Sequence, residues 1–201
     1  MTRRCLQIFL LGLAAGSCSG QASPGPKAAL TEVPAGAEDQ SGVERYFPLT
    51  HDTVFTYAVW LPESVEPEQL ILQVERRSKG RASLRSGSSV KRLELVADGI
   101  RLVTGGYLLK APLALGAEWA GPAGRVHLTA LEQNVSVPAG TFVGCLETTE
   151  TGGQGPTSRT IVITYCPDVG IVKFSVNDGE RQERFELKAF GPYVRIEELT
   201  D

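Results

Sequence analysis

The sequence predicts an all-β fold: a curved antiparallel sheet, or a partly open β-barrel, of about ten strands. From Tyr46 onward, apolar and polar residues alternate in short runs, which is typical of strands with one face toward water. Gly, Pro and Asp-Gly pairs separate these runs at the spacing of hairpins. No stretch of this region has the period of an amphipathic helix, so the strands are expected to pair with their chain neighbours.

The amino terminus has the pattern of a signal peptide over residues 1–17. Arg3 and Arg4 precede a largely apolar run, residues 6–15, which is too short to cross a bilayer that requires roughly 20 residues. Small residues then lead to Cys18, and the stretch "AAGSC" resembles a bacterial lipobox. This resemblance implies cleavage before Cys18 and a lipid anchor on its thiol. The alternative is an ordinary cleavage site with an incidental cysteine.

Residues 18–42 are expected to form a lipidated tether. They are rich in Ala, Gly, Ser and Pro and lack aromatics, so they cannot bury enough apolar surface to fold. A flexible chain of this length has a reach on the order of 25–30 Å. Ser19, rather than Asp, follows the cysteine, which in lipoproteins of Gram-negative bacteria implies the outer membrane. We therefore expect a lipid-anchored cell-envelope protein that faces the periplasm, with one β-rich domain at residues 43–201.

The individual strands follow from alternation and turn residues. "LILQV" places Leu70, Leu72 and Val74 on one face, and "TIVITY" is β-branched almost throughout. Turns are expected at Asp98-Gly99 and at residues 177–179, "NDG". The predicted strands cover residues 52–60, 68–76, 81–86, 90–97, 100–109, 124–135, 141–150, 158–166, 169–177 and 181–190.

Four short motifs run through the β region: Pro48-Leu49 before an aromatic strand, Pro-Leu-x-x-Gly-x-x-Trp from Pro112 to Trp119, Val-Pro-Ala-Gly-Thr-Phe from Val137 to Phe142, and Gly-x-Val-Lys from Gly170 to Lys173. Together they resemble a group of bacterial exported β-rich lipoproteins. The resemblance implies a curved antiparallel sheet related to the half-barrel of periplasmic lipoprotein carriers. It implies no particular activity.

Cys145 and Cys166 are the two cysteines left in the β region once Cys5 is removed and Cys18 is lipidated. A hairpin that closes over residues 151–158 places them opposite each other, and an oxidising compartment favours a disulfide. The alternative is two free thiols. A zinc site is not expected, because no Cys-x-x-Cys or neighbouring His supplies further ligands.

Few residues offer catalytic chemistry. His51 beside Asp52, and His127, are the general-base candidates, but no Gly-x-Ser-x-Gly elbow supplies a nucleophile. The serines at 86, 88 and 89 belong to a turn. We expect no catalytic residues, no cofactor and no metal. Four glutamates are expected to be solvated strand positions or turn flanks: Glu147, Glu150, Glu183 and Glu186.

One segment of the β region is strongly basic although the protein is acidic. Without residues 1–17 the chain has 18 Lys and Arg against 23 Asp and Glu, a net charge of −5. This balance, and the lack of interleaved aromatics, exclude nucleic acid as the expected partner. The segment is interpreted either as a solvated hairpin or as a contact surface for anionic lipid headgroups, lipopolysaccharide or an acidic partner. Its basic residues are Arg76, Arg77, Lys79, Arg81, Arg85, Lys91 and Arg92.

Together these patterns favour a non-enzymatic envelope lipoprotein that is held at the membrane by its lipid. The concave face of its sheet is expected to bind an apolar ligand or a protein partner. Two alternatives stay open: an accessory subunit that docks through a sheet edge, and an envelope hydrolase that uses His51 or His127.

Overall fold

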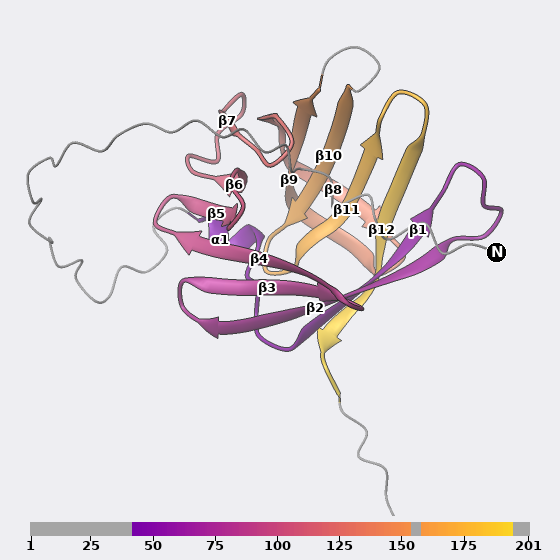
Figure 1. Cartoon of the computed structure of the whole chain (residues 1–201), viewed down its shortest axis with the longest axis horizontal. Helices are drawn as coiled ribbons and strands as arrows, with labels where there is room; N and C mark the ends of the chain where they lie inside the picture. Colours follow the sequence, from indigo (N-terminus) through magenta and orange to yellow (C-terminus); the bar gives the residue numbers. More distant parts are fainter. Residues whose placement is uncertain (1–41, 154–157, 195–201) are drawn as a thin grey trace, which may run out of the picture. The chain divides into compact units, whose positions relative to one another are not determined.

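A computed structural model describes residues 42–153 and 158–194 (Figure 1). The predicted signal peptide, the lipidated Cys18 and the tether up to residue 41 lie outside these ranges. The described residues form twelve strands and one short helix. The elements are α1 (Val43–Tyr46), β1 (Thr53–Trp60), β2 (Glu68–Ser78), β3 (Arg81–Ser86), β4 (Ser89–Val96), β5 (Gly99–Leu102), β6 (Tyr107–Lys110), β7 (Glu118–Ala120), β8 (Arg125–Val137), β9 (Gly140–Gly152), β10 (Arg159–Cys166), β11 (Gly170–Asn177) and β12 (Gln182–Pro192).

All twelve strands belong to one antiparallel sheet, in the order β6-β5-β4-β3-β2-β1-β12-β11-β10-β9-β8-β7. Strands β1–β6 and β7–β12 form two meanders, and the pairing of β1 with β12 joins them in the middle (Figure 1). The two end strands approach each other, because the Trp119 indole N–H in β7 donates to the Tyr107 carbonyl in β6 over 3.2 Å. The sheet is a nearly closed barrel, so the predicted fold class is confirmed.

The strand predictions differ from the structure in three places. The strand expected at residues 100–109 is two strands, because Gly105 and Gly106 adopt φ values of 111° and 81° and turn the chain between them. The first predicted turn lies one residue earlier, since Val96 pairs directly with Gly99. Gly99 is instead required by the close approach of β6: an added Cβ would lie 3.1 Å from the Lys110 Cα. Neither α1 nor β7 was predicted, because elements of four and three residues show no period.

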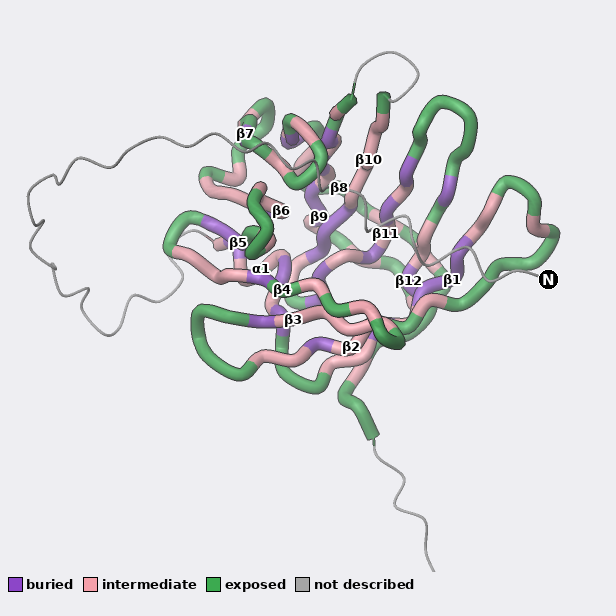
Figure 2. Tube along the Cα trace, viewed as in Figure 1, coloured by how far each residue is buried: buried purple, intermediate pink, exposed green. Residues whose placement is uncertain are grey.

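The inward faces of the strands form one continuous core. Along β11, buried and half-buried residues alternate, as expected for a strand with one core face (Figure 2). The largest fully buried side chains come from both meanders and from the segment that includes α1. They are Tyr165, Leu49, Leu93, Ile100, Leu109, Leu128, Leu146 and Leu187.

The predicted disulfide joins Cys145 in β9 to Cys166 in β10. Both residues are fully buried, and the neighbouring pair Tyr165–Leu146 fixes the register that places them opposite each other. The bridge therefore joins the two strands at the end of the β9–β10 hairpin that lies opposite its turn. This is the pairing predicted from a turn midway between the two cysteines.

The β8–β9 hairpin bends along its length. β8 contains three register shifts against β9, and Glu132 and Gly144 have φ values of 52° and 69° at the bend. Beyond the bend the hairpin reaches β12, where the Ala139 N–H donates to the Leu187 carbonyl over 2.9 Å. β8 thereby passes over the outer side of β10 and β11, and a pocket lies between them.

Candidate functional site

The concave face of the sheet, which the sequence suggested as a ligand site, is filled by residues 43–49 of the chain itself. Val43, Phe47 and Leu49 are 1%, 3% and 0% exposed. The Phe47 ring packs edge-on against the Tyr165 ring, with 5.9 Å between centroids. Gly170 lies so close to Phe47 that an added Cβ would be 3.3 Å from its ring. The interior of the curved sheet is therefore a packed core at this segment.

Polar contacts fix the same segment to both meanders. From β2, the Arg76 guanidinium donates to the Glu44 carboxylate and to the Pro48 carbonyl, each over 3.0 Å. On the other side, the Asp168 N–H donates to the Arg45 carbonyl over 2.6 Å. The Tyr46 hydroxyl donates to the Gly144 carbonyl over 3.2 Å. Residues 43–49 thus bridge the two halves of the sheet.

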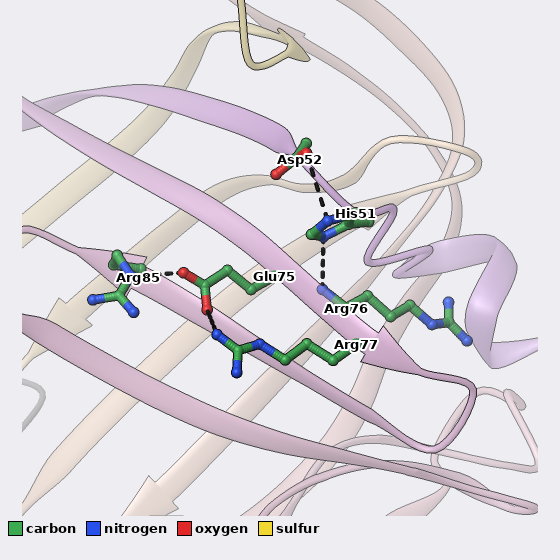
Figure 3. Close-up of polar contacts among 6 residues, drawn as sticks. All are labelled: His51, Asp52, Glu75, Arg76, Arg77 and Arg85. Carbon is green, nitrogen blue, oxygen red and sulfur yellow. Dashed lines mark hydrogen bonds and ion pairs between the residues drawn. The ribbon is translucent and has the colours of Figure 1, made fainter. Parts of the chain in front are cut away.

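Arg76 is consequently not part of the outward basic surface to which the sequence assigned it. Its side chain extends toward α1, whereas Arg77 and Arg85 point to the opposite side of β2 (Figure 3). Lys91 also differs, because it pairs with Leu84 on the inward-facing side, where burial lowers the pKa of its ammonium group. The expectation of seven outward contact residues is corrected at these two positions, and Lys79 lies exposed in the turn between β2 and β3 rather than on a strand.

The outer face of β2–β5 still carries an excess of positive charge. The Glu75 carboxylate lies between two guanidinium groups, 2.8 Å from Arg85 and 3.7 Å from Arg77, and the hydrogen bond from Arg85 lowers the pKa of Glu75. Farther along the face, Glu94 lies 2.7 Å from Arg101. The cross-strand register adds two more arginines on this face. We call it the basic face; it consists of Glu75, Arg77, Arg81, Arg85, Arg92, Glu94 and Arg101, with an excess of three positive charges.

The two histidines have structural partners. The His51 Nδ1 accepts the backbone N–H of Arg76 over 3.1 Å, and its Nε2 lies 3.5 Å from the Asp52 carboxylate (Figure 3). The His127 Nδ1 lies 3.2 Å from the Glu118 carboxylate. Within residues 42–153 and 158–194, no serine, threonine or cysteine side chain hydrogen-bonds to either imidazole. The same residues contain no cluster of three or more His, Cys, Asp or Glu side chains suited to a metal ion.

Glu150 is not the solvated strand residue that the sequence suggested. It is 6% exposed and accepts hydrogen bonds from the backbone N–H groups of Ala123 and Gly124, over 2.6 and 2.8 Å. The carboxylate thereby holds the β7–β8 turn, and its charge adds to burial in raising the pKa of Tyr165. Glu150 lies on the core face because it continues the alternate positions of the buried Leu146 and Thr148. The two-residue period of the strand therefore predicts that Glu150 is buried.

The other glutamates divide between the two faces. Glu183 is also largely buried, and this burial raises the pKa of its carboxyl group. Glu147 and Glu186 are half-buried and lie on the outer side of the sheet. Glu147 accepts a hydrogen bond from the Thr129 hydroxyl over 3.2 Å. Glu147 is one of the residues that line the pocket beneath β8.

That pocket has a volume of about 260 Å³ and opens on the outer side of β9–β11. Two valines, Val135 and Val162, contribute apolar surface to it. The remaining lining is polar and comes from four strands: Asn134, Ser136, Glu147, Thr164, Lys173 and Ser175. Sequence reasoning missed this grouping, because only the bend in β8 brings residues 134–136 over β10 and β11.

Among the described residues, no helix has the length and apolar character needed to cross a bilayer. No family model and no curated protein matches the chain. Several solved structures are similar to it, among them two bacterial proteins. One is a protein of Bacteroides fragilis inferred to be exported, with a YmcC-like fold; it has 10% sequence identity and a TM-score of 0.47, with 71% of this chain and 96% of that chain covered. The other, inferred to be a lipoprotein of Parabacteroides distasonis, has 14% identity and a TM-score of 0.47, with coverages of 73% and 98%.

Proposed function

We propose that the chain is a lipid-anchored, non-enzymatic protein of the bacterial cell envelope that holds its β domain against the anionic surface of the outer membrane. The lipobox-like stretch at Cys18 supports the anchor and the periplasmic location. The observation that carries the proposal is the basic face of β2–β5, which has an excess of three positive charges in a protein of net charge −3. Such a face is attracted to anionic headgroups, at about 1 kcal/mol per basic residue near the surface.

With the lipid anchor in place, this weak attraction is sufficient to orient the domain on the membrane. The contribution of each residue falls off within a Debye length of roughly 8 Å, so the basic face cannot recruit the protein from bulk solution at physiological salt. A domain that is already tethered to the membrane needs only to be oriented. The basic face would then turn toward the headgroups, and the strands on the far side of the β1–β12 junction would remain open to the periplasm.

Because side chains of the domain itself fill the concave face, a protein partner is a better candidate than an apolar ligand. An apolar ligand in the concave face would have to replace the buried side chains of Val43, Phe47 and Leu49. The end strands β6 and β7 are four and three residues long, so they offer little backbone for strand addition. A partner protein of the envelope would therefore bind side chains on the outer face of the sheet.

The anchor is tested by mass spectrometry of the amino-terminal peptide from membranes of the native host. We expect a peptide that begins at Cys18 and carries the mass of a diacylglyceryl group, and we expect Cys18→Ala to abolish that mass. Cys5→Ala is the matched control, since Cys5 lies in the predicted signal peptide and should leave the modification intact. A mature chain with an unmodified Cys18 would contradict the proposal.

The membrane contact is tested with vesicles that contain 30% anionic lipid and with the mature chain carrying Cys18→Ser. We expect weak binding at low salt that is lost at high salt. The triple variant Arg77→Gln, Arg81→Gln, Arg92→Gln should lower the low-salt affinity by up to about 100-fold. A control with the same charge change elsewhere, Arg45→Gln, Arg125→Gln, Arg181→Gln, should bind like the parent chain. Equal losses in both variants would assign the attraction to net charge and refute a specific face.

A further inference from the structure

The pocket beneath β8 has a lining that suits a small molecule with both an ammonium and a carboxylate group. Its floor is a row across three strands, because Thr164 in β10 pairs with Glu147 in β9 on one side and with Lys173 in β11 on the other. Within the pocket the row therefore carries a carboxylate, a hydroxyl and an ammonium in turn. Beyond the pocket Lys173 pairs with Glu186 in β12, whose carboxylate lies 3.4 Å from the Arg184 guanidinium. Neighbouring strands lie about 4.8 Å apart, so the backbones that carry the two charges are about 10 Å apart.

The two charged side chains of this row, Glu147 and Lys173, do not form an ion pair with each other. Lys173 makes no ion pair with any described residue, and Glu147 receives only the hydrogen bond from Thr129. Thr164 is 5% exposed and lines the pocket between the two charged residues. A pocket lined by an ammonium, a carboxylate and a hydroxyl favours a polar occupant, because polar groups that lose water need a hydrogen-bonding partner.

The walls of the pocket add selectivity for a small polar molecule. Ser175 presents a hydroxyl from β11 and Asn134 an amide from β8, whereas the Ser136 hydroxyl is hydrogen-bonded to the Thr141 hydroxyl over 2.9 Å. Val162 forms the apolar part of the floor, next to Ser175 in the cross-strand register. A volume of about 260 Å³ lies below the 300–1,000 Å³ that is typical of sites for drug-sized ligands.

We propose that this pocket binds a free α-amino acid through both of its charged groups. The ammonium group would pair with the Glu147 carboxylate and the carboxylate with the Lys173 ammonium, since the two groups of an α-amino acid are separated by one carbon and can bridge oppositely charged side chains on alternate strands. The Thr164 hydroxyl would donate to the carboxylate between them. The amino-acid side chain would lie toward Val162, Ser175 and Asn134.

The binding is tested by calorimetry and saturation-transfer NMR on the mature chain carrying Cys18→Ser, with serine and glutamine as probes. We expect dissociation constants in the millimolar range and a loss of at least tenfold in affinity in both Lys173→Met and Glu147→Gln. Lys188→Met is the matched control, because Lys188 is an exposed lysine of the adjacent strand β12 and lies outside the pocket. Circular dichroism verifies that each variant is folded.

Three further probes separate the contributions of the two charges. Ethanolamine should bind more weakly and depend on Glu147 alone, whereas propionate should depend on Lys173 alone. Glucose, an uncharged polyol, should not bind. The proposal is overturned if serine at 50 mM produces no response, if Lys173→Met binds serine like the parent chain, or if glucose binds as well as serine.

Discussion

Replacing Phe47 by Ala should destabilise the domain strongly, because its side chain belongs to the core rather than to a detachable segment. The ring is 3% exposed, packs against Tyr165, and lies over a glycine backbone at position 170. Truncation of a buried Phe to Ala costs about 3–5 kcal/mol, with the higher values where the surroundings cannot collapse into the cavity. Phe47 packs against Tyr165, which directly precedes the disulfide-bonded Cys166 and is thereby held in place, so we expect a loss of about 4 kcal/mol.

The assay is urea unfolding followed by the fluorescence of Trp60 and Trp119, one in each meander. For a domain of this size the denaturant slope is roughly 2 kcal/mol/M, so the midpoint should fall by about 2 M with an unchanged slope. Val65→Ala serves as control, since Val65 is 96% exposed and its truncation should shift the midpoint by less than about 0.3 M. A loss below about 1 kcal/mol for Phe47→Ala would refute the packed interior and restore the concave face as a ligand site.

Three further outcomes follow from polar and covalent contacts. Glu150→Ala leaves two backbone N–H groups of the β7–β8 turn without their acceptor, so thermal unfolding should show a loss of about 2–4 kcal/mol, and a loss under 1 kcal/mol would contradict this role. Burial raises the pKa of Glu183, so the folded state binds this proton more tightly and stability falls as pH rises through the acid range. Glu183→Gln should therefore gain stability over the parent chain at pH 7 and match it at pH 3, whereas an equal difference at both values would argue against burial as the cause. Removing the disulfide with Cys145→Ala, Cys166→Ala should cost roughly 3 kcal/mol in denaturant unfolding, and no change in midpoint would mean that the bridge does not constrain the unfolded chain.

The features that the sequence predicted correctly are those that depend on local pattern. Eleven of the twelve strands overlap the ten predicted ranges, since β5 and β6 share one of them, and only β7 has no counterpart. The disulfide followed from the position of its two cysteines around a turn. Both inferences use only alternation and turn residues, which neighbouring residues determine.

The features that were missed depend on which face a polar residue occupies. Arg76 lies in the run "ERRSKGR" and was grouped with its basic neighbours, yet it continues the inward alternation of Leu72 and Val74. Glu150 likewise continues the inward series of Leu146 and Thr148. At both positions the local composition predicts an exposed residue and the strand period a buried one, and the structure follows the strand period. Neither composition nor period predicts α1, since four residues are too few to show a helical pattern.

The strand order has a consequence for how the chain reaches this fold. Strands β2–β6 can each pair with the strand made just before them, but one edge of β1 pairs only with β12, the last strand of the domain. During synthesis from the amino terminus, one edge of β1 therefore remains unpaired while nearly the whole domain is completed. Its inward residues include the aromatic side chains of Phe55 and Tyr57, so this edge can capture a strand of another chain before β12 arrives. The nascent protein is thus exposed to aggregation until β12 pairs with β1 at the centre of the sheet, and the end strands β6 and β7 are not the critical edges.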